Sequence, residues 1–106
     1  MGNKRIEVVS ESMFYTLMAF LHGEYSGTEI AGMVENLTKG RVRLGPATLY
    51  TILGRFVEEQ ILTETRTDGR KRIYRITDKG IQMYHEERKR LAQCLADSSA
   101  WEEESK

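Results

Sequence analysis

The sequence predicts a mostly helical α+β domain that carries one small hairpin, on three observations. Three stretches before residue 60 place apolar residues at helical spacing. The period then changes to that of strands over residues 61–77, on either side of an Asp-Gly pair. A last helical stretch follows to about residue 97. A chain of 106 residues with 40% hydrophobic and 30% charged residues fits one soluble domain with a modest core.

The first helix is expected to run from about Ser10 or Ser12 to His22. Serine is a favourable N-cap residue, and Gly23 stands where a left-handed C-cap is expected. The apolar stripe of this helix is broad, which indicates that it packs on more than one partner. The stripe consists of Phe14, Leu17, Met18 and Leu21.

The second helix has a clear start signal. Ser26 and Glu29 have the spacing of a capping box, in which each side chain bonds a free backbone N–H at the other's position. Tyr25 and Ile30 are placed to form a hydrophobic staple across this start. Gly40 marks the end of the helix. A short connection, residues 41–45, leads from there into the third helix.

The third helix begins at Gly45-Pro46, because proline suits the first helical position. One face is apolar and consists of Leu49, Ile52, Leu53, Phe56 and Val57. The other face has no carboxylate in its first three turns and consists of Ala47, Thr48, Tyr50, Thr51 and Arg55. Hydroxyl and guanidinium donors suit a helix laid against nucleic acid, although an ordinary solvated face has the same composition. Tyr50 has a second interpretation, in which its ring turns into the core.

Two strands are expected around Asp68-Gly69, the pair that a type I′ hairpin turn favours. They are residues 61–67 and residues 72–77. Five cations fall on this hairpin: Arg66, Arg70, Lys71, Arg72 and Arg75. Two amphipathic helices joined by a tight link form a helix-turn-helix, whose later helix reads DNA, and a basic hairpin directly after it is a wing. The predicted architecture is therefore a winged helix-turn-helix of three helices and a two-stranded basic wing.

A terminal helix is expected to begin after Thr77 and to end at about residue 97. Its seam has alternating spacings of three and four and consists of Ile81, Tyr84, Arg88, Leu91 and Leu95. Such a short seam needs a partner, either the first helix or a second copy of the chain. The expected organisation is a DNA-binding domain over residues 1–77, a dimerisation helix over residues 78–97 and a disordered acidic tail over residues 98–106.

The charge is unevenly distributed, although the formal net charge is +0. Residues 39–75 contain nine Lys/Arg against four Asp/Glu, a local balance of +5, whereas residues 97–106 have a balance of −3. A local basic surface of this kind is typical of nucleic-acid binding.

Other classes of protein find little support in the sequence. The single cysteine, Cys94, excludes an intramolecular disulfide and a cysteine-based metal cluster, and it suits a reducing cytoplasm. His22 and His85 have no helical partner, so no metal site is expected. There is no secretory signal or membrane span, no phosphate-binding glycine loop and no nucleophile in a recognisable motif. We therefore expect a cytoplasmic protein that is not an enzyme and has no cofactor.

With these elements in order, the chain resembles the PadR-like family of winged-helix transcriptional regulators over roughly residues 10–95. Two strings carry the resemblance: Gly45-Pro46-Ala47-Thr48-Leu49-Tyr50, and Gly69 to Gly80 through the wing. The resemblance implies a homodimer that binds double-stranded operator DNA and represses transcription. The third helix would enter the major groove, and the wing would touch the backbone or the minor groove. The chain length is similar to that of the short subgroup with one C-terminal dimerisation helix.

The expected DNA-binding residues are Ala47, Thr48, Tyr50, Thr51, Arg55, Arg70, Lys71 and Arg72. The family also includes drug-responsive members with a tryptophan on the terminal helix. Here Leu91 falls at about that place and Trp101 lies in the tail, so a small-molecule effector, if there is one, is of unknown identity. The alternative function is a winged-helix module used for protein contacts, which predicts a hydrophobic third-helix surface.

Overall fold

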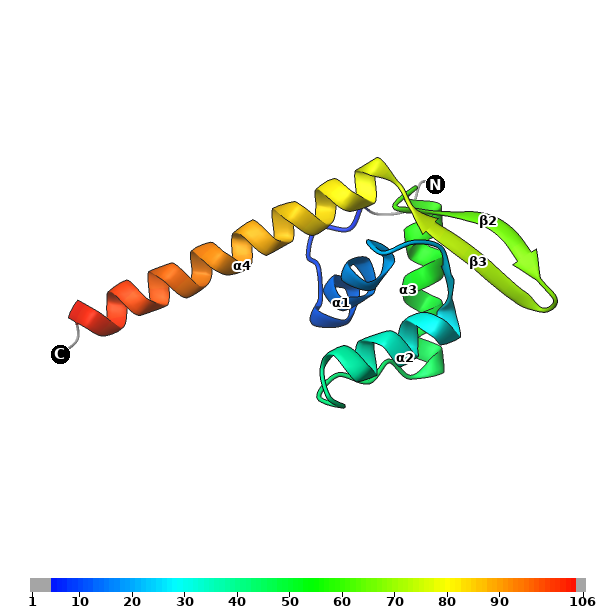
Figure 1. The fold of residues 1–106 in the computed structure, drawn as a ribbon. Helices are drawn as coiled ribbons and strands as arrows, with labels where there is room; N and C mark the ends of the chain where they lie inside the picture. The colour runs from blue at the N-terminus through cyan, green and yellow to red at the C-terminus, as the bar shows by residue number, and fades with distance from the viewer. Residues whose placement is uncertain (1–4, 105–106) are drawn as a thin grey trace.

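The computed structural model describes residues 5–104, which form four helices and three strands (Figure 1). In chain order these are α1 (Glu11–Phe20), β1 (Tyr25–Ser26), α2 (Gly27–Leu37), α3 (Pro46–Glu58), β2 (Leu62–Asp68), β3 (Lys71–Ile76) and α4 (Asp78–Glu104). The predicted fold class is confirmed: three helices, a hairpin after the third helix and a long terminal helix.

Helices α1, α2 and α3 share one hydrophobic core. Its fully buried side chains come from all three helices and from the start of the hairpin: Leu17, Phe20, Ile30, Val34, Leu53, Phe56, Ile61 and Leu62. Burial of each such side chain contributes about 1.5–3 kcal/mol, so the core determines how α2 and α3 stand relative to each other. Helix α1 has the predicted Ser10 N-cap but ends at Phe20, two residues before the expected His22.

The predicted capping box at the start of α2 is confirmed. The Ser26 hydroxyl accepts a hydrogen bond from the Glu29 N–H (3.3 Å), and the Glu29 carboxylate accepts one from the Ser26 N–H (2.9 Å). The backbone N–H of Ser26, and then its hydroxyl, lower the pKa of the Glu29 carboxyl. The first turn of α2 is thus held at a defined residue.

Helix α3 begins at Pro46 with Gly45 as its N-cap, as predicted. Its buried face consists of Leu49, Ile52, Leu53 and Phe56. Val57 was expected on that face but is 38% exposed, because it lies one residue, about 100° of rotation, from Phe56 at the centre of the buried stripe. Tyr50 is 62% exposed, which excludes the interpretation in which its ring packs into the core.

The sheet has a third strand that the sequence did not indicate. Strand β1 pairs antiparallel with β3, with Tyr25 opposite Tyr74 and Ser26 opposite Ile73, so the strand order is β1-β3-β2. A strand of two residues is too short to show a period of two. Its extended backbone at Ser26 also serves as the N-cap conformation of α2. This pairing ties the base of the hairpin directly to the start of α2.

The hairpin turn lies one residue later than predicted. Strands β2 and β3 pair as far as Asp68 opposite Lys71, so the two central residues are Gly69 and Arg70. Gly69 has a φ of +64°, and Arg70 is not among the residues with positive φ. A positive φ at the first central residue only is the pattern of a type II′ turn, not of the predicted type I′ turn. Arg70 consequently stands at the tip of the wing.

Helix α4 is longer than predicted and includes most of the expected tail. It begins at Asp78, where the Thr77 hydroxyl accepts a hydrogen bond from the Gly80 N–H (3.1 Å), and it continues to Glu104. Residues 98–104 are therefore helical rather than disordered, and residues 105–106 lie outside the described part of the chain. The serine hydroxyls at positions 98 and 99 bond the Leu95 carbonyl within the helix (2.9 and 3.1 Å). Trp101 lies on this helix and not beyond it.

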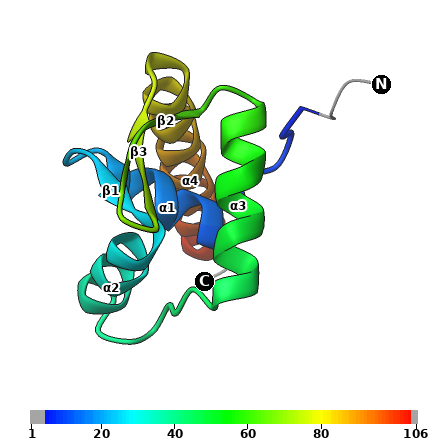
Figure 2. The same ribbon diagram turned by 90° about the vertical axis from the view of Figure 1, so that its right-hand side faces the viewer.

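The hairpin, α2 and α3 gather at one end of the molecule, while α4 extends away from it (Figures 1 and 2). The Tyr84 ring stacks on Phe14 with 5.2 Å between ring centroids, so the early turns of α4 pack on α1. From residue 88 to residue 104 every described side chain of α4 is exposed. The projecting helix makes the molecule long, 59 × 36 × 23 Å.

Candidate nucleic-acid interface

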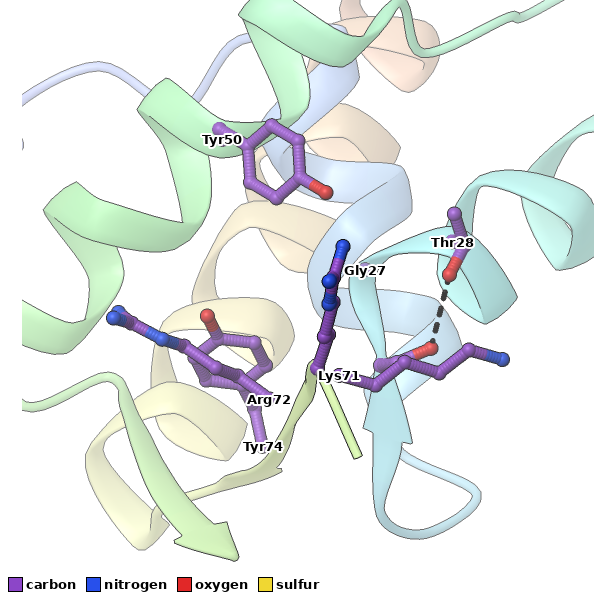
Figure 3. Close-up of a pocket in the computed structure, with 8 residues that line it drawn as sticks. Gly27, Thr28, Tyr50, Lys71, Arg72 and Tyr74 are labelled. Atoms are coloured by element: carbon purple, nitrogen blue, oxygen red, sulfur yellow. Dashed lines mark hydrogen bonds between the residues drawn. The ribbon is translucent and has the colours of Figure 1, made fainter. Parts of the chain in front are cut away.

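A groove lies between α3, the start of α2 and the wing (Figure 3). None of the eight residues that line it is acidic: Ser26, Gly27, Thr28, Tyr50, Arg70, Lys71, Arg72 and Tyr74. Three hydroxyl-bearing residue types and three cations thus face one hollow. This combination of donors suits an anion, because each group can donate a hydrogen bond.

Tyr50 forms the α3 side of the groove. Its ring extends from the helix over the hollow, with Arg72 and Tyr74 on one side and Thr28 and Lys71 on the other (Figure 3). The Tyr74 side chain is buried, and this burial, followed by the nearby charge of Glu64, raises the pKa of its hydroxyl. The hydroxyls of Tyr50 and Tyr74 can each donate a hydrogen bond to an anion in the groove.

The wing supplies the positive charge. Arg72 pairs with Glu64 on the neighbouring strand (3.5 Å), which holds its guanidinium beside the strand. Among residues 5–104, Arg70 and Lys71 form no ion pair within 4 Å, and both are exposed. Both stand at the exposed end of the wing, so their charges are available to a polyanion.

The start of α2 was not predicted as part of the site. Gly27 and Thr28 open the helix beside the wing, and the Thr28 hydroxyl lies 3.3 Å from that of Ser26. The sequence marked these residues only as a helix start. Their contribution to the groove depends on the pairing of Ser26 with Ile73, which has no local sequence signal.

The other predicted residues of α3 lie on a different side of the helix. Ala47, Thr48 and Thr51 line a shallow hollow together with Ser10 and Ser12 at the start of α1. The Thr51 hydroxyl donates to the Ala47 carbonyl (2.9 Å). The structure thus divides the predicted α3 contacts into a stripe beside α1 and Tyr50 beside the wing, all of them exposed.

Arg55 lies nearer the end of α3, next to the segment that precedes α1. It is half-buried, it lines a hollow with Ile6 and Val8, and its Nε lies 3.6 Å from a carboxylate oxygen of Glu59. The Glu59 side chain is only 8% exposed and also accepts a hydrogen bond from the Ile6 N–H (3.2 Å). Glu59 was not identified from the sequence as a partner of Arg55, although the i,i+4 spacing of the two residues is the signal for such a pair.

The predicted dimerisation residues divide in the same way along α4. Ile81 is half-buried and Tyr84 is buried against Phe14 of the same chain, so these two serve the fold. Arg88, Leu91 and Leu95 are exposed, with Leu95 at 69%. The first part of the predicted seam therefore finds its partner in α1, and only the later part is open to a second chain.

The described residues include no group of three His, Cys, Asp or Glu side chains that could hold a metal ion. Within residues 5–104, none of the helices has the length and apolar character needed to cross a membrane.

A three-helix core followed by a basic hairpin and a long terminal helix defines the winged helix-turn-helix class. The chain matches the model of the transcriptional regulator PadR-like family over residues 13–86. The match covers more than half of the chain, and the chain belongs to this family. The resemblance predicted from its two strings is thereby confirmed. No curated protein sequence matches the chain.

Several solved structures of transcriptional regulators share the fold of this chain. A transcriptional regulator from Clostridium thermocellum superposes with a TM-score of 0.69 at 22% identity, covering 86% of this chain and 97% of that one. RosR of H. salinarum superposes with a TM-score of 0.66 at 17% identity, covering 91% of this chain and 98% of RosR. Bacillus subtilis PadR, solved in complex with operator DNA, superposes with a TM-score of 0.62 at 23% identity, covering 72% of this chain and 46% of that one. At these identities the likenesses show the fold.

Proposed function

We propose that this protein is a sequence-specific DNA-binding transcriptional regulator that acts as a homodimeric repressor at a promoter operator. The observation that carries the proposal is the groove between α3 and the wing, where hydroxyls and cations converge without an acidic lining residue. The family assignment and the likeness to a regulator solved on operator DNA support it.

Helix α3 has the dimensions of a reading helix. Thirteen residues make a rod about 20 Å long, which fits a major groove about 12 Å wide. Ala47, Thr48 and Thr51 form the exposed stripe that meets base edges or phosphates, and Arg55 extends this stripe towards the end of the helix. Small and hydroxyl side chains at the start of the helix allow its backbone to come close to the duplex.

The wing and the start of α2 provide the contacts to the phosphate backbone. Arg70 and Lys71 neutralise phosphates, and Tyr50 and Thr28 donate hydrogen bonds to phosphate oxygens beside them. The basic residues are concentrated on this face of the molecule, while the net charge of the whole chain is +0. We therefore expect DNA to bind strongly to this face alone.

The matched pair Lys71→Ala and Lys89→Ala tests this assignment, because each removes one exposed lysine charge, from the wing or from α4. The probe is the promoter region upstream of the protein's own gene, titrated with salt. Each phosphate contact contributes about −0.9 to the slope of log K against log salt concentration. We expect the Lys71 variant to lose about one unit of slope and the Lys89 variant to keep the wild-type slope.

Equal slopes for the two variants would contradict the wing assignment, and no salt-dependent binding by the wild type would contradict the DNA-binding proposal. Salt-insensitive capture of a protein partner by the same face would instead favour the protein-contact module. For the repressor role, deletion of the gene should raise transcription from the bound promoter, and a fall would reverse the assignment.

The later part of α4 is proposed as the dimer interface. Leu91, Leu95 and Trp101 are exposed at 42%, 69% and 70% and fall within a sector of about 120° of the helix. A second copy of the chain would bury this stripe, and a dimer would present two α3 helices to half-sites about one helical turn apart.

Sedimentation at micromolar concentration should give about twice the chain mass of 12.2 kDa. Leu91→Ser combined with Leu95→Ser should give the monomer mass, because the apolar stripe is lost. Gln93→Ser is the control, since residue 93 lies on the opposite side of α4. A wild type that stays monomeric would refute the dimer, and a dimeric double variant would place the interface elsewhere.

A further inference from the structure

The wing changes register beside the two residues of β3 that pair with β1. Glu64 pairs with Tyr74 and Arg66 pairs with Ile73, so Thr65 is the extra residue of a β-bulge. The pairing of β1 with β3 ends at Ile73, the partner of Arg66, and beyond it residues 67–72 form an exposed two-stranded ribbon. Such a ribbon is marginally stable by itself, and a bulge bends and twists the strand that contains it.

The Glu24 carboxylate accepts two hydrogen bonds from the hairpin at the bulge. Oε1 of Glu24 accepts a hydrogen bond from the Thr65 hydroxyl (2.7 Å) and another from the Arg66 guanidinium (3.1 Å). Glu24 directly precedes β1, whereas Thr65 and Arg66 belong to β2, on the other side of β3. The side chain therefore links the two outer strands of the sheet across the central one.

We propose that Glu24 is a positioning residue for nucleic-acid binding: through Thr65 and Arg66 it holds the wing at the angle that places Arg70 and Lys71 across the groove from Tyr50. This inference rests on the proposed function. The hydrogen bonds fix the bulge where the ribbon leaves the sheet, so a small rotation there is amplified at the tip. We call the hydrogen bonds from Thr65 and Arg66 to Glu24 the Glu24 clamp. Without this clamp the ribbon would sample several directions, and ordering it on DNA would cost conformational entropy.

The charge of Glu24 and its positioning role predict opposite changes in DNA affinity when Glu24 is replaced. Removal of a negative charge beside a DNA-binding surface by itself strengthens attraction to phosphate. Removal of the clamp weakens binding, because the wing cations are no longer held in place. Glu24→Ala and Glu24→Gln remove the same charge, but only glutamine keeps an oxygen that accepts the two hydrogen bonds. The difference between these variants isolates the clamp from the charge.

The experiment measures affinity for the upstream promoter region and for a mixed-sequence duplex of about 30 bp, three helical turns. We expect Glu24→Ala to weaken binding about threefold to tenfold and Glu24→Gln to stay within about twofold of wild type. Thr65→Val, which changes no charge, should weaken binding as Glu24→Ala does, and Thr65→Ser should restore it. Glu35→Ala is the charge control, because it breaks a 3.1 Å pair with Arg43 beyond the other end of α2.

A second readout separates positioning from a general loss of structure. In a background of Arg70→Ala and Lys71→Ala, loss of Glu24 should cause no further weakening, because the cations that it positions are absent. Hydrogen exchange of the wing amides should also accelerate in Glu24→Ala while the exchange of α2 and α3 stays unchanged.

The binding of the wild type and that of Glu24→Ala test the proposed function and the positioning role separately. Salt-dependent binding by the wild type together with a Glu24→Ala variant that binds equally or more tightly overturns the positioning role and leaves DNA binding intact. Weakening of the same size in the background without Arg70 and Lys71 overturns it as well. Absence of DNA binding by the wild type overturns both.

Discussion

Gly80 is the position where one added methyl group tests how closely α4 is fixed to the base of the hairpin. A Cβ atom at Gly80 would lie 2.5 Å from the Ile61 carbonyl oxygen and 2.6 Å from Cγ1 of Ile76. The carbonyl cannot easily retreat, because it accepts hydrogen bonds from the Thr77 N–H and the Thr77 hydroxyl, both at 3.0 Å. Gly80→Ala therefore forces the start of α4 away from the sheet.

The expected magnitude follows from three contributions. Overpacking of a tight contact costs about 1–3 kcal/mol, and a weakened hydrogen bond at Thr77 adds about 1 kcal/mol. The better helix propensity of alanine offsets up to about 1 kcal/mol. We expect the free energy of unfolding of Gly80→Ala to fall by about 2 kcal/mol, with a melting temperature lower by roughly 10 °C.

Urea and thermal unfolding followed by circular dichroism, at one fixed protein concentration, measure this change. Gly32→Ala is the matched control within α2, because its Cβ would meet no heavy atom within 4 Å. There only the helix propensity acts, and stability should rise by about 0.5–1 kcal/mol. A Gly80→Ala variant as stable as wild type, or equal shifts in both variants, would refute the reasoning.

Single side chains at the helix ends and in the groove provide three further tests. Ser26→Ala removes a capping acceptor and should lower the free energy of unfolding by about 1 kcal/mol in urea. Hydrogen bonds from Ser26 and Arg90 lower the pKa of Glu29 and Glu87 respectively. Because a depressed folded-state pKa stabilises the fold above the unfolded-state pKa, stability should fall as the pH drops below about 4, less steeply in Glu87→Gln. Tyr50→Phe should weaken promoter binding about threefold in the salt-titrated assay, with an unchanged melting temperature.

Each of these tests has a contradicting result. A Ser26→Ala variant as stable as wild type would show that the capping box is dispensable. An acid-stability profile that Glu87→Gln leaves unchanged would remove the Arg90 hydrogen bond as its cause. Wild-type affinity in Tyr50→Phe would place the hydroxyl outside the phosphate contacts.

Most of the fold was predictable, because its signals are local. The Ser26 capping box and the proline at position 46 mark helix starts within one turn, and the apolar spacing identifies the buried side of α3. The errors lie where local signals are weak or ambiguous. Asp-Gly is compatible with two turn positions, and only the strand register selects Gly69-Arg70. The acidic segment after residue 97 was expected to fray, yet it continues α4 with side-chain bonds inside the helix.

The candidate site was only partly predictable. Tyr50 and the wing cations were identified from their chemistry, but whether Tyr50 faced the core or the solvent depended on the packing of α3. Thr28 was recognised only as part of a helix start. Its place beside Lys71 could not be anticipated, because the two residues are separated by more than 40 positions in the chain.

The order of the four helices and the hairpin, the local basic charge and the family follow from the sequence alone, since periodicity, caps and motif strings are properties of short segments. Which of those segments share a surface depends on the tertiary structure. The pairing of Ser26 with Ile73 brings the start of α2 to the wing, and the Glu24 clamp holds the bulge at Thr65. Contacts of this kind form between segments distant in sequence, and their energies depend on a core that no single segment contains.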